Sequence, residues 1–102
     1  MIGRRNRFRD VVLRQLDLFV RDHGPLLADC DERWVAYRQA AQEDAEERYG
    51  DYVDAVDLAR EELEQLRDSY RASLDPAAVD EYTETFNRLA RKRFPDLALE
   101  LD

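Results

Sequence analysis

Hydrophobic residues recur at spacings of three and four along most of this chain, which is the period of one face of an α-helix. The first such stretch runs from about residue 4 to residue 23 and is followed by Gly24 and Pro25. We expect Gly24 to adopt a left-handed backbone that closes the helix, and Pro25 to prevent its continuation. The apolar stripe of this predicted helix includes Phe8, Val12, Leu16 and Phe19.

A longer apolar seam follows, in which every step is again three or four residues. It predicts one continuous central helix over about 26–74, roughly 70 Å long at a rise of 1.5 Å per residue. Gly50 offers a break, because Tyr49, Gly50 and Asp51 could end one helix and cap the next. We favour continuity because the seam passes Gly50 in phase and a lone helical glycine costs only about 1 kcal/mol relative to alanine. The seam consists of Leu27, Cys30, Trp34, Tyr37, Ala41, Ala45, Tyr49, Tyr52, Val56, Ala59, Leu63, Leu66, Tyr70 and Leu74.

A third helix is predicted over about 76–94, with Asp75 as its N-cap and Pro76 in its first turn. We expect it to end before Pro95. The tail beyond it alternates leucine with other residues at Leu97, Leu99 and Leu101, a pattern too short to decide between an extended, frayed or helical conformation. The predicted inner face of the third helix consists of Val79, Tyr82, Phe86, Leu89 or Ala90, and Arg93 or Phe94.

These elements predict a single all-α domain over residues 1–102, in which two shorter helices fold back along the long central one. Each flanking helix is less than half as long as the central helix, so apolar surface would stay uncovered and would favour a homodimer. Two central helices could cross antiparallel at Gly50, the midpoint, and form a four-helix bundle at each end. The predicted dimer interface consists of Trp34, Tyr37, Ala41, Ala45, Tyr49, Gly50, Tyr52 and Val56.

The composition narrows the class of protein further. The 102 residues are 44% hydrophobic and 39% charged, with only three glycines and three prolines, which is too few turn residues for an all-β domain. No run of 18 apolar residues occurs, and the basic amino terminus lacks the apolar segment of a secretory signal. Cys30 is the sole cysteine, which excludes an intrachain disulfide and favours a reducing compartment. We therefore expect a cytoplasmic protein that does not span a membrane.

Charge is distributed unevenly along the chain, whose formal net charge is -8. Residues 1–25 carry six basic and three acidic side chains, whereas residues 26–75 carry six basic and fifteen acidic ones. A negative field of this size repels nucleic acid and anionic lipid at long range. Two arginine-rich clusters nevertheless resemble phosphate-binding arms, unless they pair with the acidic central helix. These candidate phosphate contacts are Arg4, Arg5, Arg7, Arg9, Arg88, Arg91, Lys92 and Arg93.

The remaining chemical candidates are isolated. His23, the sole histidine, has only nearby carboxylates, among them Asp22, Asp29 and Asp31, which is weak support for a metal or a general base. Cys30 lies on the seam without a histidine partner, so we expect a buried small hydrophobe rather than a nucleophile. Carboxylate pairs that share one helix face occur at Glu43/Glu46, Asp54/Asp57 and Glu61/Glu64, but no Glu-x-x-His accompanies them, so solvated charge is the better interpretation.

No catalytic residue, metal ligand or cofactor site is therefore predicted. The leading functional expectation is a non-enzymatic helical interaction module, meaning an adaptor, scaffold or small regulator that binds a protein partner. The first alternative is a nucleic-acid-associated regulator that uses the two arginine clusters. The more remote alternative is a metal-dependent all-α hydrolase that uses the carboxylates of the central helix.

Overall fold

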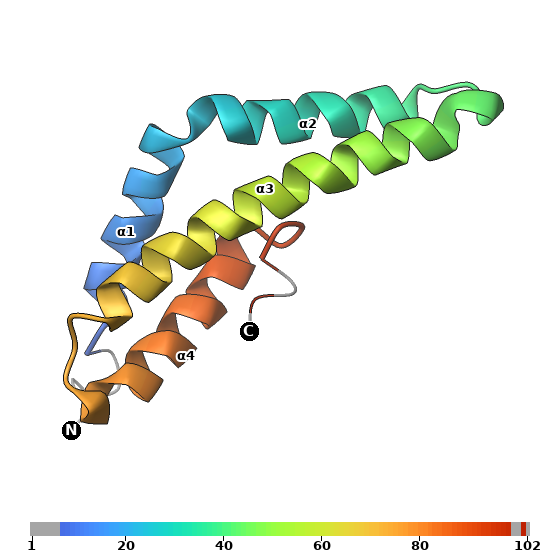
Figure 1. Ribbon diagram of the computed structural model, residues 1–102. Coiled ribbons are helices and arrows are strands. Elements are labelled where there is room, and N and C mark those ends of the chain that lie inside the picture. The colour runs from blue at the N-terminus through green and yellow to red at the C-terminus, as the bar shows by residue number, and fades with distance from the viewer. Residues whose placement is uncertain (1–6, 99–100, 102) are drawn as a thin grey trace.

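The computed structural model describes residues 7–98 and 101, and its regular elements there are all helical (Figure 1). The predicted all-α class is therefore confirmed for the described part of the chain. The molecule is elongated, 56 Å by 25 Å by 22 Å. Its elements, in chain order, are α1 (Arg9–Asp22), α2 (Gly24–Arg38), the short 3-10 helix η2 (Gln42–Asp44), α3 (Ala45–Arg71) and α4 (Pro76–Arg93).

The first helix ends where the sequence predicts, although not by the predicted mechanism. His23 alone separates α1 from α2, and its backbone N–H donates to the Phe19 carbonyl at 2.9 Å. Neither Gly24 nor any other described residue has a positive φ, so the expected left-handed glycine is wrong. Gly24 and Pro25 instead open α2, where the missing N–H of proline leaves no helical hydrogen bond unmade. The result is a sharp bend between α1 and α2 (Figure 1).

The predicted continuous helix over 26–74 is wrong, because the chain reverses direction at residues 39–44. Helix α2 ends at Arg38, Ala41 adopts an extended backbone (φ -68°, ψ 157°), and α3 begins at Ala45. The two helices then lie side by side as an antiparallel hairpin (Figure 1). A hairpin keeps each half of the apolar seam on an inward face, so unbroken three-and-four spacing does not distinguish it from one long helix. Gly50 lies inside α3 and breaks nothing.

The long helix is therefore α3, with 27 residues and a length of about 40 Å. Helix α4 follows the prediction closely: Asp75 is extended (φ -61°, ψ 142°), Pro76 is the first helical residue, and the helix ends at Arg93. The Asp75 side chain makes no capping hydrogen bond, but its backbone carbonyl accepts from the Ala78 N–H at 2.9 Å. The predicted inner face is confirmed at its centre, where the buried residues are Tyr82, Phe86, Leu89 and Ala90.

Two parts share α3. Its later half packs with α1 and α4 in a body that holds most of the core, and its early half packs with α2 in an arm that projects from the body (Figure 1). We define the arm as residues 24–57. The largest fully buried side chains all lie in the body; they are Tyr82, Phe86, Leu16, Leu63 and Val12.

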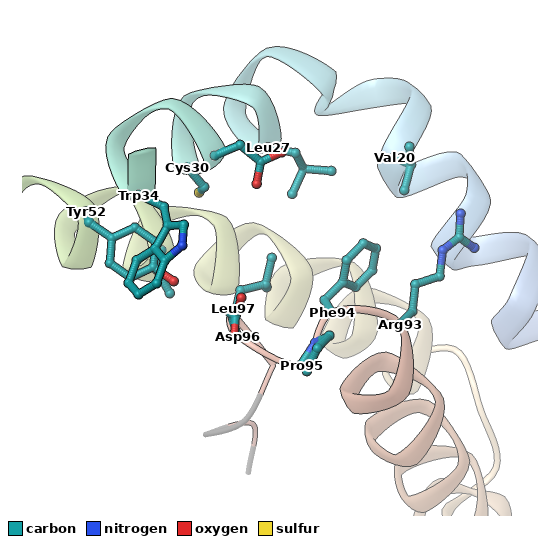
Figure 2. Close-up of a pocket in the computed structure, with 12 residues that line it drawn as sticks. Val20, Leu27, Cys30, Trp34, Tyr52, Arg93, Phe94, Pro95, Asp96 and Leu97 are labelled. Carbon is teal, nitrogen blue, oxygen red and sulfur yellow. The ribbon is translucent and has the colours of Figure 1, made fainter. Parts of the chain in front are cut away.

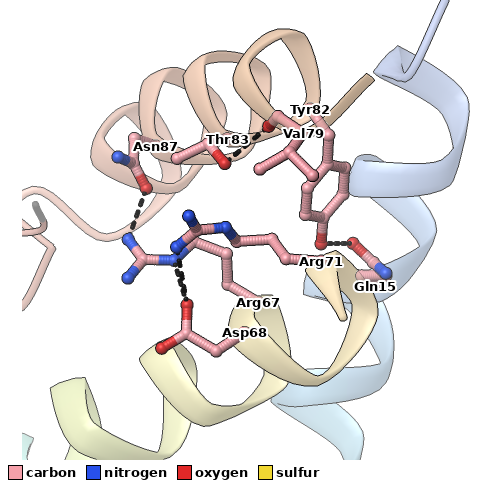
Figure 3. Close-up of polar contacts among 8 residues, drawn as sticks. All are labelled: Gln15, Arg67, Asp68, Arg71, Val79, Tyr82, Thr83 and Asn87. Carbon is pink, nitrogen blue, oxygen red and sulfur yellow. Dashed lines mark hydrogen bonds and ion pairs between the residues drawn. The ribbon is translucent and has the colours of Figure 1, made fainter. Parts of the chain in front are cut away.

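Polar contacts tie the body together (Figure 3). The Tyr82 hydroxyl, which is completely buried, donates to Gln15 Oε1 at 2.8 Å and so joins α4 to α1. The guanidinium of Arg67, only 5% exposed, donates to Asn87 Oδ1 at 3.0 Å and to Asp68 at 2.9 Å. Buried polar groups are costly unless paired, so these contacts fix which faces of the three helices meet.

The tail folds back onto the body through a turn that starts after Phe94. Leu97, Ala98 and Leu101 are buried, and the Arg91 guanidinium donates to the Leu101 carbonyl at 2.6 Å. This answers the question that the alternating leucines left open, because the tail residues that the structure describes pack as an irregular segment against the core. Leu99 lies outside the described residues.

Candidate docking surface on the arm

Four aromatic side chains gather on one face of the arm, and we call them the aromatic cluster: Trp34, Tyr37, Tyr49 and Tyr52. Each helix of the hairpin contributes two of them at a spacing of three residues, which places both on the same helix face. Across the hairpin, the ring centroids of Trp34 and Tyr52 are 5.0 Å apart and those of Tyr37 and Tyr49 are 5.1 Å apart. Trp34 and Tyr49 nevertheless remain 39% and 47% exposed. The cluster is therefore packed on one side and open on the other.

An apolar groove continues from the cluster toward the body (Figure 2). Its volume is about 380 Å³, within the range of ligand-sized pockets. Trp34 and Tyr52 form one end, and Phe94, Pro95 and Leu97 form a wall opposite α2. The other apolar residues that line the groove are Val20, Leu27, Cys30 and Val56. Cluster and groove together give a continuous apolar surface that runs from the arm to the body.

Two acidic side chains and one basic side chain stand at this apolar surface. Asp31 on α2 and Asp96 on the tail line the groove itself. Burial raises the pKa of the Tyr52 phenol above its usual value of 10.0, and the carboxylate of Asp96 is the next cause. Arg93 also lines the groove, but it is held by Asp17 of α1 at 2.5 Å. The charges that remain unpaired by Arg93 at the groove are therefore the carboxylates of Asp31 and Asp96.

Cys30 lies in the wall of the groove and is 8% exposed, which confirms the expectation of a buried small hydrophobe. Burial raises the pKa of its thiol above the usual value of 9.0, and the neighbouring carboxylates of Asp29 and Asp31 raise it further. A thiol with a raised pKa stays protonated near neutral pH and is a poor nucleophile. Its place in the wall makes it an apolar contact.

The structure brings together part of the predicted dimer interface. Trp34, Tyr37, Tyr49 and Tyr52 form the aromatic cluster, and Val56 lines the groove beside them. Three other predicted residues lie apart: Ala41 and Ala45 at the reversal, and Gly50 on an exposed face of α3. A Cβ added at Gly50 would meet nothing within 4 Å, so no close backbone approach occurs there within the chain. The homodimer itself stays a prediction.

The two arginine clusters do not form one patch. Arg7 lies 3.6 Å from Glu81 near the start of α4, whereas Arg93 at the end of α4 pairs with Asp17. Glu81 and Arg93 are twelve positions apart on α4, which corresponds to about 18 Å. The expected pairing with the acidic central helix is replaced by pairing of Arg7, which precedes α1, with α4 and of Arg93 with α1. Arg4 and Arg5 lie outside the described residues.

The remaining members of the arginine clusters differ in their environment. Arg91 is engaged with the Leu101 carbonyl. Arg9, Arg88 and Lys92 are exposed and form no ion pair with any residue that the structure describes. Arg88 and Lys92 are four residues apart on α4 and share a face, but these two cations and Arg9 on a molecule of net charge -8 make a weak electrostatic footprint for a phosphate backbone.

The metal and acid–base candidates stay dispersed. His23 Nε2 lies 3.9 Å from Glu62, and its ring stacks against Phe19 at 4.8 Å. Asp57 is paired with Arg60 at 2.6 Å, and Glu61 and Glu64 line a shallow depression on α3. Within residues 7–98 and 101, no three His, Cys, Asp or Glu side chains are grouped so that they could hold a metal ion. The carboxylates of α3 therefore have the geometry of a solvated helix face.

Sequence reasoning identified the aromatic residues but missed the groove, because its far wall comes from the segment after α4. Phe94 is predicted only as a possible last residue of an inner helix face, and Leu97 only as part of an alternating pattern too short to interpret, so neither indicates a wall opposite α2. The one available indication was the apolar character of Phe94 and Leu97.

Comparison with protein-family models, curated proteins and solved structures finds no match to this chain. In the part of the chain that the structure describes, none of the helices has the length and apolar character needed to cross a membrane. The functional interpretation therefore rests on the aromatic cluster and the groove of the arm.

Proposed function

We propose that this chain is a non-enzymatic protein–protein interaction module that binds its partner through the aromatic cluster and the adjoining groove. The observation that carries the proposal is the exposure of Trp34, which lines an apolar groove of about 380 Å³, and of Tyr49, whose ring centroid lies 6.1 Å from that of the groove residue Tyr52. Tryptophan and tyrosine are enriched at the energetic centres of protein interfaces, because they bury large areas at little cost in conformational entropy. An adaptor, scaffold or small regulator would use such a surface.

The construction of the arm supports this proposal. Two helices alone build it, so one long side has no third helix to cover its apolar residues. The body, in contrast, buries its large side chains among three helices and the tail. An uncovered apolar surface costs solubility unless a partner uses it. The aromatic cluster is therefore better explained by binding than by packing within the chain.

The alternative partner is a second copy of this chain, which is the partner that the homodimer prediction proposes. In that arrangement the aromatic clusters of two arms would face each other in a four-helix assembly, without any crossing at Gly50. Such a dimer brings two strongly acidic arms together, which opposes it electrostatically. A cytoplasmic location likewise stays a prediction. The nucleic-acid alternative draws less support, because Arg7, Arg91 and Arg93 have partners within the chain.

Site-specific photo-crosslinking in the source organism tests the proposed function. A photo-reactive amino acid is placed at Tyr49, in the cluster, or at Leu58, which is 53% exposed on the same helix but does not line the groove. We expect a discrete protein adduct from position 49 that position 58 does not give. The crosslinked protein is then purified and its binding is measured against the wild type and against Trp34→Ala.

Loss of that reconstituted binding in Trp34→Ala, with the fold unchanged by circular dichroism, is the expected result. Equal crosslinking from both positions would contradict the proposal. Reconstituted binding that is indifferent to Trp34→Ala would contradict it equally, because the contact would then lie elsewhere.

A further inference from the structure

We infer that the groove accepts a basic amphipathic helix from a partner protein, whose apolar side chains enter between Trp34 and Phe94. The inference rests on the proposed function and adds the chemical class of the partner. Three features of the surface support it: the shape left open by the two arm helices, the sign of the charge around the groove, and the way in which the arm's own cations are already engaged.

The open shape fits a helix. Helices α2 and α3 run antiparallel, and the Phe94–Leu97 segment closes the groove at the body end (Figure 2). A third helix laid along two others completes a small bundle, and amphipathic helices bind apolar grooves in this way through residues spaced by three and four. Helix α2 has 15 residues and is about 22 Å long, so about four turns of a partner helix would cover it.

The charge around the groove selects a basic partner. Residues 24–57 carry ten acidic and three basic side chains. Asp31 and Asp96 stand at the groove itself, where they would face cations on the flanks of a bound helix. A second arm would bring the same negative charge instead and would be repelled. Complementarity of charge therefore favours a basic helix over a second copy of this chain.

The arginines of the arm do not offset this field at the groove. Arg33 donates to Asp29 Oδ2 at 3.0 Å and to the Asp51 carbonyl at 3.1 Å, and Arg48 lies 3.7 Å from Asp51. Those contacts belong to a separate depression on the arm, whose lining residues are not those of the groove. Arg38 lies over the Trp34 ring, 5.9 Å from its centroid. No arginine of the arm lines the groove, and Arg93, which does, is paired with Asp17, so Asp31 and Asp96 remain available to a partner.

Two designed peptides test the inference. Each peptide is about four helical turns long, carries leucines at positions i, i+3, i+4 and i+7, and lacks tryptophan. All remaining positions are lysine in the first peptide and glutamate in the second. Trp34 is the sole tryptophan of the chain, so its fluorescence reports binding at the cluster directly. We expect saturable binding of the lysine peptide and none of the glutamate peptide at the same concentrations. A scrambled lysine peptide of equal composition controls for diffuse attraction.

Matched variants locate the contact. Asp31→Asn with Asp96→Asn and Glu61→Gln with Glu64→Gln each remove two negative charges, but only the first pair lies at the groove. We expect the groove pair to weaken binding of the lysine peptide roughly threefold to tenfold at low salt and the control pair to leave it nearly unchanged. With a fluorophore on the peptide as the readout, Trp34→Ala should weaken binding by about thirtyfold or more, as for an interface anchor. Leu58→Ala should not.

The contradicting results are distinct from those of the proposed function. Equal binding of both peptides would overturn the basic partner and leave an apolar docking surface intact. Equal weakening by the two charge pairs, or equal binding of the scrambled peptide, would show diffuse attraction only. The inference is wrong if neither peptide binds. It is also wrong if Trp34 fluorescence changes with the concentration of the chain alone, because a second copy then occupies the surface. In either case the crosslinking experiment still tests the proposed function.

Discussion

The ring centroids of Tyr37 and Tyr49 lie 5.1 Å apart, although the two residues are twelve positions apart in the sequence. In one continuous helix the same two residues would be about 18 Å apart along the axis. The contact therefore exists only because the chain turns back at residues 39–44. The two halves of the apolar seam therefore contact each other within a single chain, and the outer faces of the aromatic rings stay exposed. The residues predicted to form a crossing between two long helices instead form an exposed surface on one side of the arm.

Replacing Gly50 with alanine should stabilise the protein. Gly50 lies within α3, has no positive φ, and its added Cβ would meet nothing within 4 Å. Alanine in a helix interior is favoured over glycine by about 0.5–1 kcal/mol. Urea unfolding followed by circular dichroism measures this gain. A loss of stability in Gly50→Ala, or a change in oligomeric state by light scattering, would instead support a close helix crossing at this residue.

The tail should contribute to the stability of the body. Leu101 is 3% exposed, and truncation of a buried leucine leaves a cavity. We expect Leu101→Ala to lower the free energy of unfolding by about 2 kcal/mol or more. Asp96→Ala, an exposed position in the same segment, serves as the control and should change it by less than about 0.5 kcal/mol. Equal effects of the two substitutions would contradict the packing of the tail.

The contact between α3 and α4 at Arg67 should be sensitive to its acceptor. Asn87 Oδ1 accepts from the guanidinium of Arg67 at 3.0 Å, and both side chains are buried. Removing the acceptor of a buried charged donor costs about 1–3 kcal/mol. We therefore expect Asn87→Ala to be clearly destabilising in thermal or chemical unfolding, and Arg88→Ala, its exposed neighbour, to be nearly neutral. A neutral Asn87→Ala would show that this hydrogen bond does not contribute to the fold.

Stability should fall at alkaline pH through Tyr82. Burial raises the pKa of its phenol well above 10.0, and the hydrogen bond to Gln15 only partly offsets that rise. Below pH 10 the phenol is neutral in both the folded and the unfolded chain, so its full contribution is present. Above pH 10 the unfolded chain loses the proton while the folded chain keeps it, so the free energy of unfolding decreases as pH rises.

Unfolding of Tyr82→Phe, measured from pH 8 to pH 11, checks this dependence. The variant should lose about 1 kcal/mol at neutral pH with the hydroxyl that donates to Gln15, and its stability should decline less steeply above pH 10 than that of the wild type. Tyr52, whose pKa burial also raises, accounts for part of the remaining slope. An identical decline in both proteins would mean that the Tyr82 phenol is not protected from ionisation.

The parts of the fold that sequence predicts correctly are those with a local chemical signal. Asp75 and Pro76 define the start of α4, Pro95 lies just beyond its end, and the spacing of Tyr82 and Phe86 identifies its buried face. Each of these features depends on a few neighbouring residues. Backbone restriction and helical periodicity therefore suffice to predict them.

The reversal between α2 and α3 has no such signal. It occurs within the sequence Gln39 to Asp44, which contains neither glycine nor proline, and Ala41 adopts an extended backbone that any residue can reach. What selects the hairpin is tertiary: facing Trp34 with Tyr52 and Tyr37 with Tyr49 buries apolar surface that one long helix would leave exposed. The groove was missed for the same reason, because Phe94 and Leu97 reach it only after the tail has folded back.

The reversal is the feature on which the docking surface depends, because only the reversal brings the two aromatic rings of α2 into contact with the two aromatic rings of α3. The hairpin register that pairs Trp34 with Tyr52 places Ala28 level with Leu58, and both are exposed. Spin labels at Ala28→Cys and Leu58→Cys, in a Cys30→Ala background diluted with unlabelled chain, report the distance within one molecule.

We predict a label separation below about 25 Å, from adjacent helices packed 8–10 Å apart with labels on their outer sides. A distribution centred near 45 Å, the span of thirty residues in an uninterrupted helix, would contradict the hairpin and with it the aromatic docking surface.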